Sequence, residues 1–450
     1  MATSALNIRK RLGQRHRTSR AVRIGLALFF LLVVFDGALR KWVLPSQEAV
    51  IFVLKDMVLW GVFLIYALKR DPLKLPRPLH STWVPVLVVA YIFVVLAQAF
   101  NIHQPTLIVS AIGLKSHLAY LPLIILLPPI AARITERQVT RFLWWYALLI
   151  VVPLTTLSMY QFSQPPSAWV NQYVEGMSIG VAKIGKFPRV TGTFSFIGSY
   201  IKYLQFNAVL GASAVLVGLK YGRRSLVASG GIIVSGTAIV VPMTGSRSPV
   251  VVIAAGLIAL FLIMRNRKYW IPLLAIAVLG AFVAAEGFSE SIVLQGWEAL
   301  GERTERSGLA QDRIERFLLG PITGLEEAGV FGYGVGTNHQ AAPGYVSGSI
   351  WEGWVGGDNR VLRVFMELGT LGWLVLTAMK LSFLYIATRV LRESRRPVEL
   401  IVGGTAFCVL LSYLLLPVVY NVVSGALYWG AVGAVLGIWS LQQTSVRRAT

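Results

Sequence analysis

The stretch AVRIGLALFFLLVVFDGALRKWVLP, residues 21–45, indicates the fold class of the whole chain. Its apolar run over 22–39 is close to the roughly 20 residues that an α-helix needs to cross a membrane. A basic tail precedes the run, as in a secretory signal, but no small-residue cleavage site follows it. We therefore expect a retained first membrane span.

Apolar stretches of similar length recur along the chain. Of the 450 residues, 55% are hydrophobic and only 14% are charged, whereas soluble globular chains carry about a quarter charged residues. The sequence therefore predicts an all-α, polytopic membrane protein with about 12 transmembrane helices. We place these spans near 22–39, 48–68, 82–100, 107–131, 142–162, 196–219, 225–244, 249–264, 269–287, 364–388, 399–418 and 424–441.

Basic residues are in large excess, with 42 Lys and Arg against 20 Asp and Glu and a net charge of +22. In a soluble chain this excess would suggest a nucleic-acid partner. When loops are counted alternately from the N-terminal tail, however, 26 of the 42 basic residues fall on one side. Cytoplasmic loops of membrane proteins are rich in Lys and Arg. We therefore expect both termini in the cytoplasm and no nucleic-acid binding.

The predicted organisation follows from these spans. A basic cytoplasmic tail (1–21) precedes helices 1–9 (22–287), an extracytoplasmic loop (288–363), helices 10–12 (364–441) and a cytoplasmic tail (442–450). The long loop, with Glu286 at its edge, holds eleven of the acidic residues. Its first part mixes apolar, Glu and Arg residues at helical spacing, which is typical of amphipathic helices on a membrane or of a small exposed helical hairpin.

Several ionisable residues lie within predicted spans, where charges are costly and are usually paired or functional. Asp36 and Arg40 have the spacing of partners on one helix face. Lys55 and Asp56 are adjacent in the second span, and buried pairing is the plain interpretation for these four. Lys115 and His117, in GLKSHLAYLPL, indicate either a helix break or a substrate cavity.

A second set of cations is expected on the outer face. Arg189 precedes the sixth span, Arg247 lies in the short turn TGSRSP, and Arg360 and Arg363 begin the tenth span. A fixed guanidinium can hold phosphate oxygens through paired hydrogen bonds. The alternative is that each arginine extends to lipid headgroups. Because Arg189 and Arg247 are expected together beside the long loop, we favour phosphate binding.

The loop segment GYGVGTNHQAAPGY contains His339, which could accept a proton or donate a hydrogen bond to phosphate. A solvated loop histidine is the alternative. The glycines of this segment superficially resemble a nucleotide loop, but the strand and helix of a dinucleotide fold are not expected here. Glu367 is expected to pair with Arg363, four residues before it. The less favoured alternative is that Glu367 acts as a general base.

No metal-binding motif is found in the sequence, and the single cysteine, Cys408, excludes a disulfide within the chain. We therefore expect no cofactor. Glycosyl or phosphoryl transfer would then rely on cationic side chains to stabilise the leaving group.

Three motifs occur in the order that is seen in a known family. They are RVTGTFSFIGSYIKYLQF at 189–206, TGSRSPVVVIAAGLIAL at 244–260, and FGYGVGTNHQ followed by DNRVLRVFMELGTLGWLVL within 331–376. The chain thus resembles the O-antigen ligase and polymerase family of bacterial polysaccharide-assembly membrane proteins. The resemblance covers roughly the C-terminal 60% of the chain. The segment FDGALRKWVLP is similar to exopolysaccharide-associated members.

The resemblance implies a multi-pass protein of the bacterial inner membrane. It would transfer glycan from an undecaprenyl-pyrophosphate carrier to a sugar hydroxyl of a glycan or lipid acceptor, with membrane lipids and other polysaccharide-assembly proteins as further partners. Arg189, Arg247 and Arg360 would bind the pyrophosphate. His339 would be the catalytic loop histidine, but the family often has His-Asn where this chain has Asp358-Asn359, which makes Asp358 a rival base.

Two alternatives belong to other classes of protein. A 12-span transporter or flippase of lipid-linked sugars usually has two related halves, and none is visible here. A structural subunit of an envelope complex would not need the arginines. Within the enzyme class, we slightly favour a polymerase over a ligase; the two share a donor and differ only in the acceptor.

Overall fold

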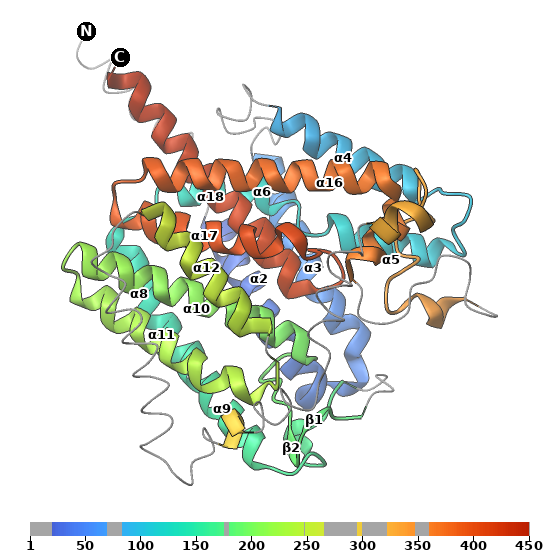
Figure 1. Ribbon diagram of the computed structural model, residues 1–450, viewed down its shortest axis with the longest axis horizontal. Helices are drawn as coiled ribbons and strands as arrows, with labels where there is room; N and C mark the ends of the chain where they lie inside the picture. Colours follow the sequence, from blue (N-terminus) through green and yellow to red (C-terminus); the bar gives the residue numbers. More distant parts are fainter. Residues whose placement is uncertain are drawn as a thin grey trace.

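The computed structural model describes residues 20–69, 83–174, 180–246, 248–264, 295–298, 322–346 and 360–449. The helices form one bundle (Figure 1). The longer helices are α2 (Arg20–Ala38), α3 (Glu48–Lys69), α4 (Val84–Gln98), α5 (Leu107–Leu118), α8 (Glu136–Tyr146), α9 (Val152–Ser163), α10 (Ile197–Lys220), α11 (Arg224–Met243), α12 (Ser248–Met264), α16 (Arg360–Glu393), α17 (Pro397–Leu415) and α18 (Val422–Ala449). The short elements include α6 (Leu123–Leu126), α7 (Pro128–Ala131), the π-helical turns Leu39–Val43 and Ala147–Val151, and the two-residue strands β1 (Lys183–Ile184) and β2 (Phe187–Pro188).

The predicted helical membrane protein is confirmed. Within the described residues, nine helical segments are long and apolar enough to span a membrane, and α4 and α12 are shorter apolar helices. These elements occupy eleven of the twelve predicted span positions. The remaining position, 269–287, lies outside the described residues, as does most of the predicted loop 288–363. The count of twelve therefore stays a prediction.

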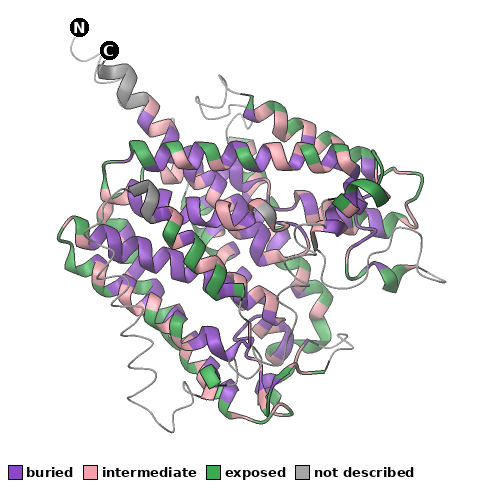
Figure 2. Ribbon diagram, viewed as in Figure 1, coloured by how far each residue is buried: buried purple, intermediate pink, exposed green. Residues whose placement is uncertain are grey.

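Helix α10 is the centre of the bundle. It packs against α11, α12, α17 and α18, and it is buried along most of its length (Figure 2). The backbones of the two helices approach closely at Gly211 of α10 and Gly230 of α11. A Cβ added to either glycine would lie within 2.8 Å of the carbonyl oxygen of the other. Membrane helices pack closely through such small residues, so these glycines fix α11 against α10.

Several spans are interrupted rather than continuous. The predicted fourth span divides into α5, α6 and α7, and α5 ends directly after His117. Helix α16 contains a break at Gly369, whose φ of 68° and ψ of 179° are not helical. In membrane proteins, irregular backbone at depth is found where it is enclosed by protein or lines a cavity. Both breaks face the polar site described below.

Candidate functional site

The loop segment 329–339 is held by hydrogen bonds against the end of α4 and the break in α16. The Tyr333 N–H donates to the Met366 carbonyl oxygen at 2.7 Å, and the Leu371 N–H donates to the Val330 carbonyl oxygen at 3.2 Å. From the other side, the Gln104 Nε2 donates to the Val335 carbonyl oxygen at 2.7 Å. These bonds give the glycine-rich segment a fixed path through the bundle.

Glycines are needed at two points on this path. Gly336 has a φ of 84°, and a Cβ there would lie 2.2 Å from the Val109 carbonyl oxygen of α5. Gly369 has a φ of 68°, and a Cβ there would lie 2.5 Å from the Gly332 nitrogen. Left-handed φ values and close backbone approach both favour glycine. Gly336 of GYGVGTNHQ and Gly369 of α16 thus allow the loop to pack closely against α5 and α16.

Glu367 lies at the centre of this arrangement and is completely buried. Its Oε2 is 2.9 Å from the Nε2 of His117 on α5, which is also completely buried. Its Oε1 accepts a hydrogen bond from the backbone N–H of Asn338 at 3.1 Å. The Nδ1 of His117 is in turn 2.8 Å from the Tyr91 hydroxyl of α4. A buried carboxylate needs such partners, and here they join α4, α5 and α16 to the loop.

His339 follows Asn338 and is half-buried. Its Nδ1 accepts a hydrogen bond from the Ala341 N–H at 3.1 Å. Burial lowers the pKa of His339 below the ordinary histidine value, and the Glu367 carboxylate opposes part of that shift. The neutral ring therefore dominates at neutral pH. With Nδ1 acting as an acceptor, the ring proton is on Nε2, so this edge of His339 is a hydrogen-bond donor.

Tyr420 borders His339 from the connection between α17 and α18. The two ring centroids are 6.2 Å apart. Burial and the nearby Glu367 carboxylate raise the pKa of the Tyr420 hydroxyl well above its ordinary value. Its φ of 52° makes it the single non-glycine residue with a positive φ in the described part of the chain. Strain of this kind costs on the order of 1–3 kcal/mol and is often found at functional sites.

Arg189 lies against the turn between α11 and α12. Its Nε donates to the Thr244 carbonyl oxygen at 2.7 Å, and the Val190 N–H donates to the Met243 carbonyl oxygen at 3.2 Å. Gly245, with a φ of 62°, allows the turn, and a Cβ there would lie 3.1 Å from the Arg189 Nε. The structure therefore brings Arg189 to the turn that carries Arg247, although the residues are far apart in sequence.

The other predicted site residues are described only in part or not at all. Arg247 and Asp358 are not among the described residues. Arg360 begins α16, and only its backbone is described. Their roles in the site therefore stay predictions.

The charges of the first spans form a compact network, but the predicted pair between Asp36 and Arg40 is wrong. Asp36 Oδ2 is 2.9 Å from the Lys55 Nζ, and Arg40 pairs with Glu48. Helix α2 ends at Ala38 and a π-helical turn follows, so the spacing of an α-helix does not hold between Asp36 and Arg40. Pairing is nevertheless the role of both residues, as expected.

Lys115 belongs to the same network. Its Nζ is 3.0 Å from the Asp56 Oδ2 and 3.4 Å from the centroid of the Phe52 ring. Lys55 and Arg40 approach the same ring, at 4.3 Å and 5.1 Å. Three cations thus approach one aromatic ring, and each of them pairs with a carboxylate, that of Glu48, Asp36 or Asp56. Because the formal charges balance, we assign the network a structural role.

Sequence reasoning missed three residues of the site: Tyr91, Asn338 and Tyr420. Tyr91 resembles an ordinary apolar residue of a span, and Asn338 enters the cluster through its backbone N–H. His117, which pairs with Glu367, comes from α5, and the pair predicted between Arg363 and Glu367 stays a prediction. The one available signal was the presence of His117 and Glu367 within apolar spans, because charges at that depth need partners.

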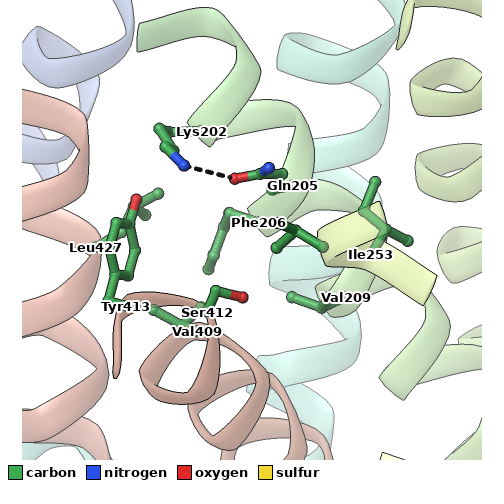
Figure 3. A pocket seen from close by; sticks show the side chains of 10 residues that line it. Lys202, Gln205, Phe206, Val209, Ile253, Val409, Ser412, Tyr413 and Leu427 are labelled. Atoms are coloured by element: carbon green, nitrogen blue, oxygen red, sulfur yellow. Dashed lines mark hydrogen bonds between the residues drawn. The ribbon is translucent and has the colours of Figure 1, made fainter. Parts of the chain in front are cut away.

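A narrow crevice between α10, α12, α17 and α18 is lined mainly by apolar side chains (Figure 3). Lys202 lies at its polar end and donates to the Gln205 Oε1 at 3.3 Å. Its Nζ is 5.6 Å from the centroid of the Tyr413 ring. Its lining includes neither Arg189 nor any residue of the cluster around Glu367. Across the described residues, no group of three acidic, His or Cys side chains could hold a metal ion.

The fold and the site together define a polytopic α-helical membrane protein with a polar cluster formed by helix breaks and loops. The model of the O-antigen ligase family matches residues 232–377, from within α11 into α16. This match supports membership of the chain in the O-antigen ligase family. It confirms the resemblance for the motifs at 244–260 and within 331–376, whereas the motif at 189–206 lies outside the matched residues. The family suggests a membrane glycosyltransferase activity on lipid-linked glycan. A comparison with curated proteins found no match.

Proposed function

We propose that the protein joins glycan from an undecaprenyl-pyrophosphate carrier to a sugar hydroxyl during O-antigen or exopolysaccharide assembly, with polymerase slightly favoured over ligase. The observation that carries the proposal is the hydrogen bond from Arg189 to the Thr244 carbonyl oxygen. It fixes one guanidinium beside the turn of the second predicted arginine, Arg247. Paired guanidinium groups suit the oxygens of a pyrophosphate.

Arg189 is suited to this task because its orientation is set before substrate binds. Its Nε–H donates to the Thr244 carbonyl oxygen of the turn, which fixes the direction of the guanidinium. Arg247 and Arg360 would add positive charge to the same leaving group. As the glycosidic bond to pyrophosphate breaks, charge grows on the leaving oxygen, and fixed cations stabilise that transition state more than the ground state.

His339 is assigned as a hydrogen-bond donor to a pyrophosphate oxygen. Its Nδ1 is already engaged by the Ala341 N–H, and its lowered pKa favours the neutral ring with the proton on Nε2. A ring in this state cannot accept a proton at Nε2. Of the two bases considered, Asp358 is then the better candidate.

The step is a direct displacement. The acceptor hydroxyl oxygen bonds to the anomeric carbon, and the bond from that carbon to the pyrophosphate oxygen breaks. The electron pair stays on the leaving pyrophosphate, which Arg189, Arg247 and Arg360 neutralise. The hydroxyl proton passes to the Asp358 carboxylate. All groups in this step are side chains, so we propose a metal-independent reaction.

Glu367 supports the site without touching substrate. Its carboxylate accepts a hydrogen bond from the backbone N–H of Asn338, and Asn338 is the residue before His339. Because Glu367 is itself fixed by His117, the position of the His339 backbone is determined by helices α5 and α16. Correct placement to within about an ångström is worth up to roughly a hundredfold in rate.

The proposal is tested by electrophoresis of surface and secreted glycan from a deletion strain complemented with either wild-type protein or the Arg247→Ala variant. We expect the variant to reach the membrane at normal abundance and to make no long glycan. Normal glycan from the variant would refute the proposal. Lost long chains with single repeats retained identify a polymerase, and chains that accumulate on the carrier lipid identify a ligase.

The rival function, flipping of lipid-linked sugars, is separated by the side on which the donor accumulates. In the deletion strain, a glycosyltransferase leaves the unused donor on the outer face of the membrane. A flippase leaves it on the inner face. Access of a membrane-impermeant glycosidase to the donor in intact spheroplasts distinguishes these outcomes.

A further inference from the structure

A shallow cleft lies at the end of the bundle opposite Arg189, where α8 begins and α10 turns into α11. One wall is the first turns of α8, and the other is the α10–α11 connection. Its lining side chains are Glu136, Arg137, Thr140, Arg141, Trp144 and Arg223. None of them belongs to the site proposed for glycan transfer.

Two contacts fix the walls of the cleft. The Arg223 Nε is 2.9 Å from the Glu136 Oε1, and the Trp144 Nε1 donates to the Ser225 Oγ at 2.7 Å. Gly222 has a φ of 65°, which allows the sharp turn that presents Arg223 to α8. The cleft is therefore formed by the protein before any ligand binds.

The charge of the cleft is positive. Three arginines line it against one glutamate, so two positive charges remain after the pair between Arg223 and Glu136 is counted. Arg137 and Arg141 are four residues apart on α8, which places them on one face of the helix. Two guanidinium groups in this arrangement suit a phosphate group.

An apolar surface continues from the arginines along the outside of the same span. Trp145 is 58% exposed, Leu149 is 61% exposed and Phe142 is 53% exposed. Tryptophan is enriched where a span meets the membrane interface. A free phosphate ion has no apolar part that could contact this surface. A phospholipid, in contrast, would place its headgroup at the arginines and an acyl chain along Trp145 and Leu149.

We propose that this cleft is a binding site for one anionic phospholipid. Arg137 and Arg141 hold the phosphate, Arg223 closes the cleft from the α10–α11 connection, and one acyl chain lies on the exposed apolar side of the span. The site recognises the negative headgroup, because a zwitterionic lipid brings its own cation to the cluster. Lipid bound here would join α8 to α11 at the end of the bundle.

The test is native mass spectrometry of the full-length protein in detergent, titrated with phosphatidylglycerol or phosphatidylcholine. We expect the wild-type protein to retain one phosphatidylglycerol in preference to phosphatidylcholine. The Arg137→Gln/Arg141→Gln variant should bind phosphatidylglycerol about thirtyfold more weakly, from about 1 kcal/mol for each arginine near a lipid headgroup. Trp145→Ser should weaken binding of phosphatidylglycerol with no change in the charge of the cleft.

The matched control is Arg389→Gln/Arg392→Gln, which removes two exposed arginines from the last turns of α16 at the same end of the bundle. This variant should bind phosphatidylglycerol as the wild type does. Equal loss in both double variants would show general attraction to a basic surface and overturn the proposal. Displacement of the lipid by inorganic phosphate alone, or unchanged binding in the α8 variant, would also overturn it. Equal thermal unfolding of the variants excludes loss of fold as the cause.

Discussion

His117 and Glu367 lie 250 residues apart in sequence and form a pair 2.9 Å long in which both side chains are completely buried. Neither group contacts solvent, so their polar atoms find partners only within the protein. The pair connects the end of α5 to the helix break at Gly369 and, through Asn338, to His339. The position of the proposed phosphate donor thus depends on a contact between two distant spans.

Glu367→Ala is expected to inactivate the protein and to destabilise it by about 3 kcal/mol or more, because it leaves the Nε2 edge of the buried His117 without its partner. Glu367→Gln should keep much of the activity. Its amide oxygen can still accept from the Asn338 N–H, and its NH₂ group can donate to the other tautomer of His117. Glycan electrophoresis and thermal unfolding in detergent measure the two effects. Equal loss of activity in both variants would contradict a positioning role and favour a role for the negative charge.

His339→Gln and His339→Asn separate the two edges of the imidazole. The Gln amide reaches the position of Nε2 and can donate a hydrogen bond, whereas the Asn oxygen replaces Nδ1 and can accept from the Ala341 N–H. We expect partial activity from His339→Gln and at least a tenfold lower activity from His339→Asn, in line with the usual effect of losing a transition-state hydrogen bond. Initial rates of glycan formation give the comparison. Complete loss in both variants would instead favour His339 as the base.

The lowered pKa of His339 predicts how stability depends on pH. Below the ordinary histidine pKa of about 6.5 the unfolded chain takes up a proton that the folded protein resists, so the folded state loses stability as pH falls. Above that pH the effect disappears. The free energy of unfolding of the wild type minus that of His339→Asn should therefore decrease as the pH is lowered from neutral to mildly acidic values. A difference that stays constant from pH 8 to pH 5 would contradict the assigned environment of His339.

The spans were predictable because hydropathy over about 20 residues reports directly on membrane crossing. The meeting of Arg189 with the TGSRSP turn was also predictable in outline, since both lie next to spans on the same predicted face. The Asp36–Arg40 pair failed because helical spacing assumes a continuous α-helix, and the chain changes to a π-helical turn at Leu39. Rules based on local sequence therefore predict the length of each span and the membrane side of each loop. They fail for side-chain pairing where an α-helix changes to another helical geometry.

The contacts around Glu367 were beyond sequence reasoning for a different reason. They depend on how α4, α5 and α16 pack, and no periodicity within one segment contains that information. Helices α4 and α16 pack side by side, which brings Tyr91 to the same polar cluster as Glu367. Apolar burial selects the faces of these helices, but the pairing of His117 with Glu367 depends on helix order in three dimensions.

Arg189→Ala is expected to abolish glycan transfer, and Arg189→Lys should restore little of it. A lysine ammonium is a single point charge that cannot both bind the Thr244 carbonyl oxygen and present a second edge to the pyrophosphate. The matched control is Lys186→Ala in the β1–β2 turn, which removes one exposed positive charge three residues away. Activity that falls equally in the control and in Arg189→Ala would show that local charge alone is responsible.

Gly336→Ala is expected to abolish activity although it adds a single methyl group. The alanine would have to hold a φ of 84°, and its Cβ would lie 2.2 Å from the Val109 carbonyl oxygen and close to Gly113. A left-handed conformation alone costs an L-residue roughly 1–2 kcal/mol, and the clash forces the loop away from α5. Gly344→Ala, five residues beyond His339, is the control because a Cβ there meets nothing within 4 Å. Glycan electrophoresis together with immunoblots of the membrane fraction measures both variants, and normal glycan from Gly336→Ala would show that the path of this loop against α5 does not matter for the reaction.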